Sequence, residues 1–149
     1  MLANKNQILP VVPDRIPEAL KSRPQWANLK AERRGNAELL DKIPYQALHP
    51  TVHASSTNPT SWTGFADALA CYHSRESTGV DAIAFACGNG IGGLDLDGCV
   101  DPQTGKVESW AMEIVNEIDS YTELSLSGTG LRIFIKAPEA KGVKGDRVE

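Results

Sequence analysis

The sequence predicts an α+β protein in which helices and paired strands alternate along the chain. Two stretches carry apolar residues at helical spacing. The first has Thr60, Ser61 and Thr63 as candidate caps and Gly79 as its stop, and the second is 109–118. Other stretches alternate apolar and polar residues, as half-buried strands do, and glycine-rich turns separate them. Because these strands come as hairpins between helices, and not as repeated strand-helix-strand units, we expect an antiparallel or mixed sheet and not a doubly wound fold.

Length and composition fit a folded domain that needs no disulfide or metal for stability. The chain has 149 residues, of which 41% are hydrophobic and 23% charged, and a single core at this size buries about two-thirds of the unfolded surface. No apolar run reaches the roughly 18 residues that a membrane span needs, and the start lacks the apolar stretch of a secretory signal. We therefore expect a soluble intracellular protein without a membrane partner.

The first part of the sequence, up to residue 59, has the patterns of an extended arm, a short helix, a strand and a long loop. Prolines at the end of residues 1–15 favour an extended arm, and one domain is expected over 16–149. A short helix is predicted at 16–21 and a strand at 25–30, followed by a turn between strands over 31–41. Residues 43–59 are rich in Pro, His, Ser and Thr and predict a long loop.

The second half predicts two helices and two pairs of strands. Phe65, Ala68, Leu69 and Tyr72 fall on one helical face, with Gly79 as the stop. The apolar run 81–87 and the run 93–97 predict two strands joined by a glycine turn. A second helix is predicted to start at Ser109 and run to 118. A further hairpin is predicted from 121–126 and 131–136.

Cysteine usage and charge narrow the functional classes. Cys71, Cys87 and Cys99 lack zinc-type spacing and predict reduced, mostly buried thiols. The net charge of −4 argues against a polybasic nucleic-acid binder without excluding nucleic acid. Residues 51–149 hold most of the acidic side chains, so the chemistry is expected there.

Two nucleotide-binding patterns carry little weight. Residues 88–93 match G-x-G-x-x-G, but a strand, and not a helix, is predicted to follow them, so a hairpin turn is the better interpretation than a dinucleotide site. The chain has no G-x-x-x-x-G-K-[ST] run, which excludes a P-loop ATPase.

The pair Asp95 and Asp97 is a stronger signal. Residues two apart on a strand project from one face, so these carboxylates are expected side by side, with Leu94 and Leu96 facing the core. A cation between two carboxylates relieves their repulsion, and oxygen ligands suit Mg²⁺ or Mn²⁺. A solvated strand face that ends in an Asp-Gly turn is the alternative.

A second motif follows at 125–132. Small residues allow backbone N–H groups and hydroxyls to approach a phosphate closely, and Arg132 has a guanidinium that can bind phosphate at two points. An ordinary hairpin turn with an exposed arginine is the alternative. Neither motif decides a function alone.

Together, in this order and spacing, the motifs resemble the primase-polymerase domains of phages and plasmids, within the archaeo-eukaryotic primase superfamily. The resemblance covers roughly residues 16–149. It is carried by Gly93-Leu94-Asp95-Leu96-Asp97-Gly98-Cys99, Asp101-Pro102-Gln103-Thr104-Gly105-Lys106, Trp110-Ala111 and Ser120-Tyr121-Thr122-Glu123-Leu124-Ser125-Leu126-Ser127-Gly128-Thr129-Gly130-Leu131, and upstream by Pro24-Gln25-Trp26, Lys42-Ile43-Pro44-Tyr45 and Ala54-Ser55-Ser56-Thr57-Asn58-Pro59-Thr60-Ser61-Trp62.

The resemblance implies a catalytic core with an RRM-like sheet that joins dNTPs or NTPs on a single-stranded DNA template with two divalent metals, Mg²⁺ or Mn²⁺. It implies replication of a phage or plasmid in the cytoplasm of a bacterial host cell, with a helicase domain or protein as a possible partner. Metal ligands implied by the family's motifs are Asp95, Asp97 and Glu149, which are also the implied catalytic residues. Implied nucleotide-binding residues are Ser125, Ser127, Gly128, Thr129, Gly130, Arg132 and Lys42, with the 54–57 loop as a weaker candidate.

Two departures from the family pattern open an alternative. The family's second motif usually ends in a His, and Arg132 stands there, so phosphate binding can persist while the chemistry changes. The family's third motif is a hydrophobic residue followed by an acidic one, and Val148-Glu149 occupies its place here. Family members continue past this motif, so we expect the domain to be truncated at its C-terminal end. The alternative is a catalytically inactive primase-like domain that binds nucleic acid, nucleotide or a protein partner. A structural or regulatory domain unrelated to nucleotides is the third hypothesis.

Overall fold

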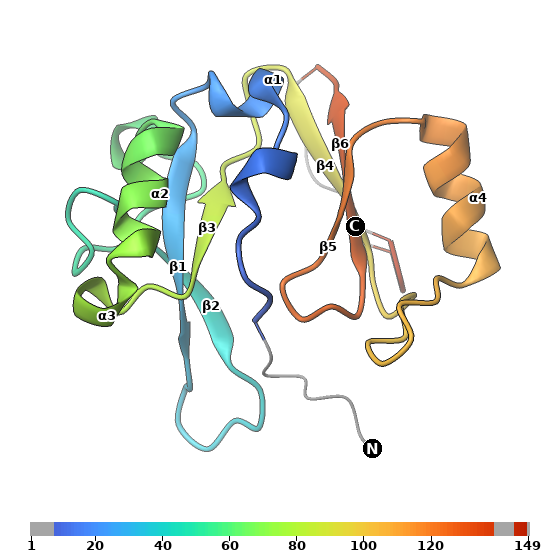
Figure 1. Cartoon of the computed structure of the whole chain (residues 1–149), viewed down its shortest axis with the longest axis horizontal. Helices are drawn as coiled ribbons and strands as arrows, with labels where there is room; N and C mark the ends of the chain where they lie inside the picture. Colours follow the sequence, from blue (N-terminus) through green and yellow to red (C-terminus); the bar gives the residue numbers. More distant parts are fainter. Residues whose placement is uncertain (1–7, 139–144, 149) are drawn as a thin grey trace. The chain divides into compact units, whose positions relative to one another are not determined.

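The computed structural model describes residues 8–138 and 145–148, and their secondary structure is mixed α and β, which confirms the predicted α+β class (Figure 1). The chain forms two compact units. The first-sheet unit is Pro10–Ala86, and the second-sheet unit consists of the described residues of Met1–Leu9 and Cys87–Glu149. Each unit has one three-stranded antiparallel sheet. The expected boundary between an arm and a domain at residue 16 stays a prediction.

The first-sheet unit is built around the central strand β1, with α2 packed against the sheet. Its strand order is β2-β1-β3, and α2 packs on β1 and β3 (Figure 1). Short helical segments precede the sheet and flank α2. The elements are the 3₁₀ segments η1 (Pro13–Arg15) and η2 (Pro59–Ser61), the helices α1 (Glu18–Lys21), α2 (Phe65–His73) and α3 (Arg75–Thr78), and the strands β1 (Trp26–Glu32), β2 (Asp41–Tyr45) and β3 (Ala82–Phe85).

Two side chains of β1 join the sheet of this unit to its helices. The Trp26 ring is buried and meets the rings of Phe65 and Phe85 edge-on, with centroids 5.0 and 5.2 Å away. The buried Asn28 donates from Nδ2 to the carbonyl oxygens of Ala68 on α2 and Ala82 on β3. The predicted strand at 25–30 is therefore confirmed, and it is the central one.

The predicted loop over 43–59 is wrong at its start, because β2 runs to Tyr45. Proline is disfavoured in strands because it lacks an N–H, and Pro44 hides the strand pattern of this segment. Here β2 is an edge strand. The Pro44 carbonyl accepts from Ala54 N–H on the side away from β1, so the missing N–H removes no bond of the β1–β2 ladder.

The helix predicted from Phe65 to the stop at Gly79 forms as two pieces. The predicted caps Thr60, Ser61 and Thr63 do not cap it, because Gly64 is its N-cap. Residues 59–61 form η2, α2 ends at His73, and α3 follows after Ser74. Gly79 ends α3 with a φ of +74°, a conformation that glycine adopts without steric cost, so the predicted stop is confirmed.

The predicted pairing across the glycine turn is also wrong. Strands do form at 82–85 and 91–96, but β3 pairs with β1, whereas β4 (Ile91–Leu96) pairs with β6. Gly88 and Ile91 bond each other's backbone in a tight turn whose three residues 88–90 all have positive φ. The turn redirects the chain from one sheet into the other, and local sequence carries no signal for the distant partner strands.

The second-sheet unit has the strand order β4-β6-β5, with β5 at Thr122–Leu124 and β6 at Leu131–Lys136. Both pairs are antiparallel, so β4 and β5 run in the same direction with β6 between them. The helix α4 (Ser109–Ile118) connects β4 to β5 (Figure 1). This is a split β-α-β arrangement, and it confirms the predicted second helix and the hairpin of β5 and β6.

The core of the second-sheet unit lies between α4 and one face of its sheet. Leu96 of β4, Ile133 of β6 and Ala111 of α4 have no exposed surface, and Trp110 and Ile114 of α4 pack against this cluster. Because strand residues alternate between faces, the residues next to Leu96 and Ile133 lie on the face opposite α4. No helix among residues 8–138 and 145–148 is long and apolar enough to cross a membrane.

Replacing Leu96 with alanine should lower the free energy of unfolding by about 3 kcal/mol, because the substitution leaves a cavity in this core. The matched control is Leu124→Ala, at a leucine with 49% of its surface exposed, for which a loss below about 0.5 kcal/mol is expected. Urea unfolding followed by circular dichroism measures both. Equal losses would show that the core is elsewhere.

Candidate functional site

Three ionisable side chains form a row across the sheet of the second-sheet unit. In the strand register Asp95 of β4 faces Arg132 of β6, and Arg132 faces Glu123 of β5. Leu96 and Ile133, the neighbours of Asp95 and Arg132, belong to the core under α4. The charged row therefore lies on the sheet face that α4 does not cover.

Arg132 and Asp95 form a two-point ion pair. Arg132 Nε lies 2.6 Å from Asp95 Oδ1, and Arg132 Nη2 lies 2.8 Å from Asp95 Oδ2. Both side chains are partly buried, with 40% and 30% of their surface exposed. The hydrogen bonds and charge of Asp95 raise the pKa of Arg132 further above its usual range. The guanidinium expected to bind phosphate thus binds the first predicted metal ligand in this arrangement.

Glu123 completes the row, and sequence reasoning did not single it out. Its Oε2 accepts a hydrogen bond of 2.8 Å from the Tyr121 hydroxyl. Burial raises the pKa of Glu123, and the Tyr121 hydrogen bond and the Arg132 charge only partly oppose this. The Tyr121 ring stacks on Phe134, with centroids 5.9 Å apart. The alternation of β5 and β6 across a short turn was the signal that could have placed Glu123 opposite Arg132.

Asp97 lies just beyond the last residue of β4 and is exposed. Its backbone N–H donates to the carbonyl oxygen of Arg147 at 2.8 Å, and Val148 forms an antiparallel bridge with Leu96. The segment 145–148 therefore borders the end of β4. That the Asp95 and Asp97 carboxylates face one another stays a prediction.

The turn at 127–130 lies directly against the end of β4. A Cβ added to Gly130 would be 2.6 Å from the Leu96 carbonyl oxygen and 3.6 Å from Asp97 Cα. The Thr129 carbonyl accepts from Val100 N–H at 3.0 Å on the other side. The structure thus brings together the backbones of the two predicted motifs, as their combination in one site requires.

The hydroxyl groups of this turn bind one another. Ser127 Oγ lies 2.8 Å from Thr129 Oγ1 and 3.3 Å from Ser125 Oγ, and Ser125 Oγ accepts from Gly130 N–H. Gly128 is buried beside the Leu9 side chain and has a φ of +75°. The hydroxyls therefore hold the turn in shape, and a phosphate would have to replace some of these bonds.

The remaining predicted site residues belong to the other unit or lie outside the described residues. Lys42 is an exposed residue of β2 in the first-sheet unit, and the exposed Ser55–Thr57 part of the 54–57 loop belongs to the same unit. Glu149, the predicted third metal ligand, lies outside the described residues.

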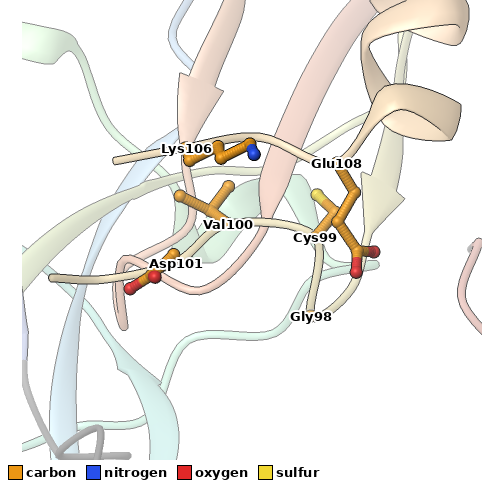
Figure 2. A pocket seen from close by; sticks show the side chains of 6 residues that line it. All are labelled: Gly98, Cys99, Val100, Asp101, Lys106 and Glu108. Carbon is orange, nitrogen blue, oxygen red and sulfur yellow. The ribbon is translucent and has the colours of Figure 1, made fainter. Parts of the chain in front are cut away.

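A shallow hollow of about 360 Å³ begins one residue after Asp97. Figure 2 shows Gly98 to Asp101 on one stretch of chain and Lys106 and Glu108 on the returning stretch. Glu108 Oε2 accepts from Trp110 Nε1 at 2.6 Å and from Arg147 Nη2 at 2.9 Å, and these bonds lower the pKa of Glu108. The hollow carries both charge signs and does not include Asp95. Its lining residues are Gly98, Cys99, Val100, Asp101, Lys106 and Glu108.

The cysteines are free thiols, as predicted, and two of them are buried. Cys71 and Cys99 are buried, whereas Cys87 is exposed. Cys87 precedes the glycine turn, and its Sγ would be 3.2 Å from a Cβ added to Gly93. Protein atoms around the sulfur displace water and raise the pKa of Cys87, although the charge of Arg132 lowers it in part.

The described arrangement does not fit a divalent cation at Asp95. Both carboxylate oxygens of Asp95 are bound by Arg132. Among residues 8–138 and 145–148, no group of three or more His, Cys, Asp or Glu side chains is close enough to hold a metal ion. A cation at Asp95 therefore requires Arg132 to leave.

Comparison with known proteins gives one informative similarity. No family model matches the chain. A protein named DNA Primase-polymerase, from Nitratiruptor phage NrS-1, is 31% identical over 118 residues. The match supports a relationship to phage primase-polymerases. It covers 79% of this chain but only 15% of the phage protein, so the chain spans a small part of that relative's length.

Gly130→Ala should destabilise the second-sheet unit by about 1–3 kcal/mol, because the added methyl group would collide with the Leu96 carbonyl. Gly92→Ala is the control. Its added Cβ would have its nearest neighbour, the Ile135 side chain, at 3.5 Å, so a change below about 1 kcal/mol is expected. Thermal unfolding of both variants measures the difference. Equal stability would contradict the close approach of this turn to β4.

Glu123 should make stability depend on pH in a defined direction. Because its pKa is raised in the folded chain, folding favours the protonated acid, and this contribution is lost as the pH rises through the folded pKa. Glu123→Gln should therefore gain stability relative to the parent between the ordinary glutamate pKa and neutral pH. Urea unfolding at a series of pH values measures the difference, which would stay constant if Glu123 were solvated.

Proposed function

We propose that the chain is a nucleotidyltransferase domain of the primase-polymerase type, which extends DNA or RNA on a single-stranded DNA template during replication of a phage or plasmid. The similarity to the phage DNA Primase-polymerase carries this proposal. The match covers 118 of the 149 residues, so at most 31 residues at either end lie outside it. Asp95 and Asp97 are farther than that from both ends, and the match therefore includes them. The proposed setting is the cytoplasm of a bacterial host, and a helicase domain or protein is the proposed partner.

The strand order of the second-sheet unit supports an RRM-like core as part of this proposal. An RRM has a four-stranded sheet built from two halves in which a helix connects strands that have another strand between them. The elements β4, α4, β5 and β6, with the order β4-β6-β5, match one such half and its following strand. Asp95 and Arg132 then stand on neighbouring strands of the sheet face free of α4.

The proposed site combines carboxylates at and beyond the end of β4 with the turn at 127–130. Asp95 and Asp97, with Glu149 as a third ligand, are the proposed ligands of Mg²⁺ or Mn²⁺, an ion that supplies Lewis acidity and neutralises phosphate charge. The described position of Arg132 does not fit that ion. The proposed contacts to the dNTP or NTP are made by Ser125, Ser127, Gly128, Thr129, Gly130, Arg132 and Lys42.

The Arg132–Asp95 ion pair favours a second candidate function. A chain in which this pair is permanent keeps the sheet and the turn but lacks a free carboxylate at Asp95. Such a domain would bind nucleotide, single-stranded DNA or a protein partner without joining nucleotides. Binding of labelled DNA that weakens steeply with salt, in the absence of synthesis, would identify it.

Incorporation of labelled dNTP or NTP on a primed or unprimed single-stranded template tests the first candidate. The chain should incorporate nucleotide. The Asp95→Ala/Asp97→Ala double variant should lose about 10²-fold or more, because it removes the proposed ligands of the cation that would neutralise charge at the reacting phosphate. Glu113→Ala/Glu117→Ala is the control, since it removes two exposed carboxylates of α4. Equal incorporation by all three proteins would reject the roles of Asp95 and Asp97.

A further inference from the structure

The bond pattern around Asp95 suggests how cation binding at this site is controlled. We infer that Arg132 is a built-in competitor of divalent cations for Asp95, so that the resting site holds a guanidinium where Mg²⁺ or Mn²⁺ would bind. The inference rests on the proposed function for the identity of the site. Beyond the proposed metal ligands, it assigns Arg132 a role in weakening cation binding at Asp95.

The geometry makes the competition direct. Arg132 uses Nε and Nη2 to bind both oxygens of Asp95, at 2.6 and 2.8 Å. A cation that binds either oxygen from the same side therefore displaces at least one of these hydrogen bonds. A guanidinium is charged at every physiological pH, so Arg132 cannot leave by losing its proton, as a histidine at this position could.

The surrounding charges hold Arg132 in this position. Asp95 lies on one side of it in the strand register, and Glu123 lies on the other. A divalent cation on Asp95 would place positive charge beside the guanidinium, so the two cannot share the carboxylate at low cost. Arg132 follows Gly130 of the 127–130 turn by two residues. A polyphosphate that reached the guanidinium from this turn would offer it acceptor oxygens in place of those of Asp95.

The strength of the pair sets the size of the effect. Hydrogen bonds between charged groups in a partly buried setting are stronger than those between neutral groups. A cation that must first break such a pair has an apparent affinity reduced by the fraction of molecules in which Asp95 is free. Removal of Arg132 should therefore tighten cation binding on the order of tenfold to a hundredfold.

Mn²⁺ titration of the 149-residue chain, followed by electron paramagnetic resonance of free Mn²⁺, tests the inference. The Arg132→Gln variant should bind Mn²⁺ at least about tenfold more tightly than the parent, and Arg132→Lys should fall between them because it keeps the charge but loses the two-point contact. Arg34→Gln is the matched control. It removes one positive charge from the exposed Arg34–Asp41 ion pair, and it should bind Mn²⁺ like the parent.

Two further measurements test whether Mn²⁺ binds at Asp95 and whether the result depends on the folding of Arg132→Gln. The gain in Arg132→Gln should disappear when Asp95→Asn is added. In the unaltered chain, Mg²⁺ should speed the exchange of the Arg132 Nε–H proton with water, measured by nitrogen-15 NMR, because this proton loses its Asp95 partner. The second measurement needs no variant, so it decides the question even if Arg132→Gln does not fold.

The outcomes separate this inference from the proposed function. Equal, Asp95-dependent Mn²⁺ binding by the parent and Arg132→Gln would overturn the competition while supporting the proposed metal site. No Mn²⁺ binding by either protein would overturn both the competition and the proposed metal site. Tighter binding by Arg132→Gln that Asp95→Asn abolishes supports the inference even where no nucleotide is incorporated.

Discussion

The antiparallel pairing of β4 with β6 is the constraint on which the candidate site depends. It turns Leu96 and Ile133 toward α4, where they are fully buried. The same alternation turns Asp95 and Arg132 to the other face and sets them opposite each other. A shift of this register by one residue would bury charge and expose the core, so the apolar packing fixes the position of the ion pair. Stability and the charged row are thus consequences of one strand alignment.

The chemistry of this ion pair depends on which side chain stands at position 132. A histidine beside Asp95 would share it with other cations according to pH, whereas an arginine presents a permanent charge with two matched donors. Glu123 adds little negative charge to this pair, because burial raises its pKa and favours its neutral form. Asp95 and Arg132 therefore balance each other's charge, which two free carboxylates cannot do.

Local patterns in the sequence were sufficient for the fold class, the α4 helix, the β5–β6 hairpin and the stop at Gly79, because each depends on neighbouring residues. They failed where a partner lies far along the chain. The turn predicted between strands over 31–41 does join β1 to β2, but the extent of β2 was missed because Pro44 is tolerated only at an edge. The strands β3 and β4 were paired with each other because the sequence does not show that each has another partner. The site residues were found as motifs, but the Arg132–Asp95 contact depends on strand register, which no motif contains.

The bond between Ala54 N–H and the Pro44 carbonyl has a consequence for the behaviour of the chain in concentrated solution. An unpaired strand edge invites another molecule to add a strand, which is a common start of aggregation. On β2 the residues 52–54 already occupy this edge, since Val52 O accepts from Gln46 N–H and Ala54 N–H binds Pro44. Pro44 also has no backbone N–H that an added strand could bind. The first sheet is thereby closed on this side against self-association by strand addition.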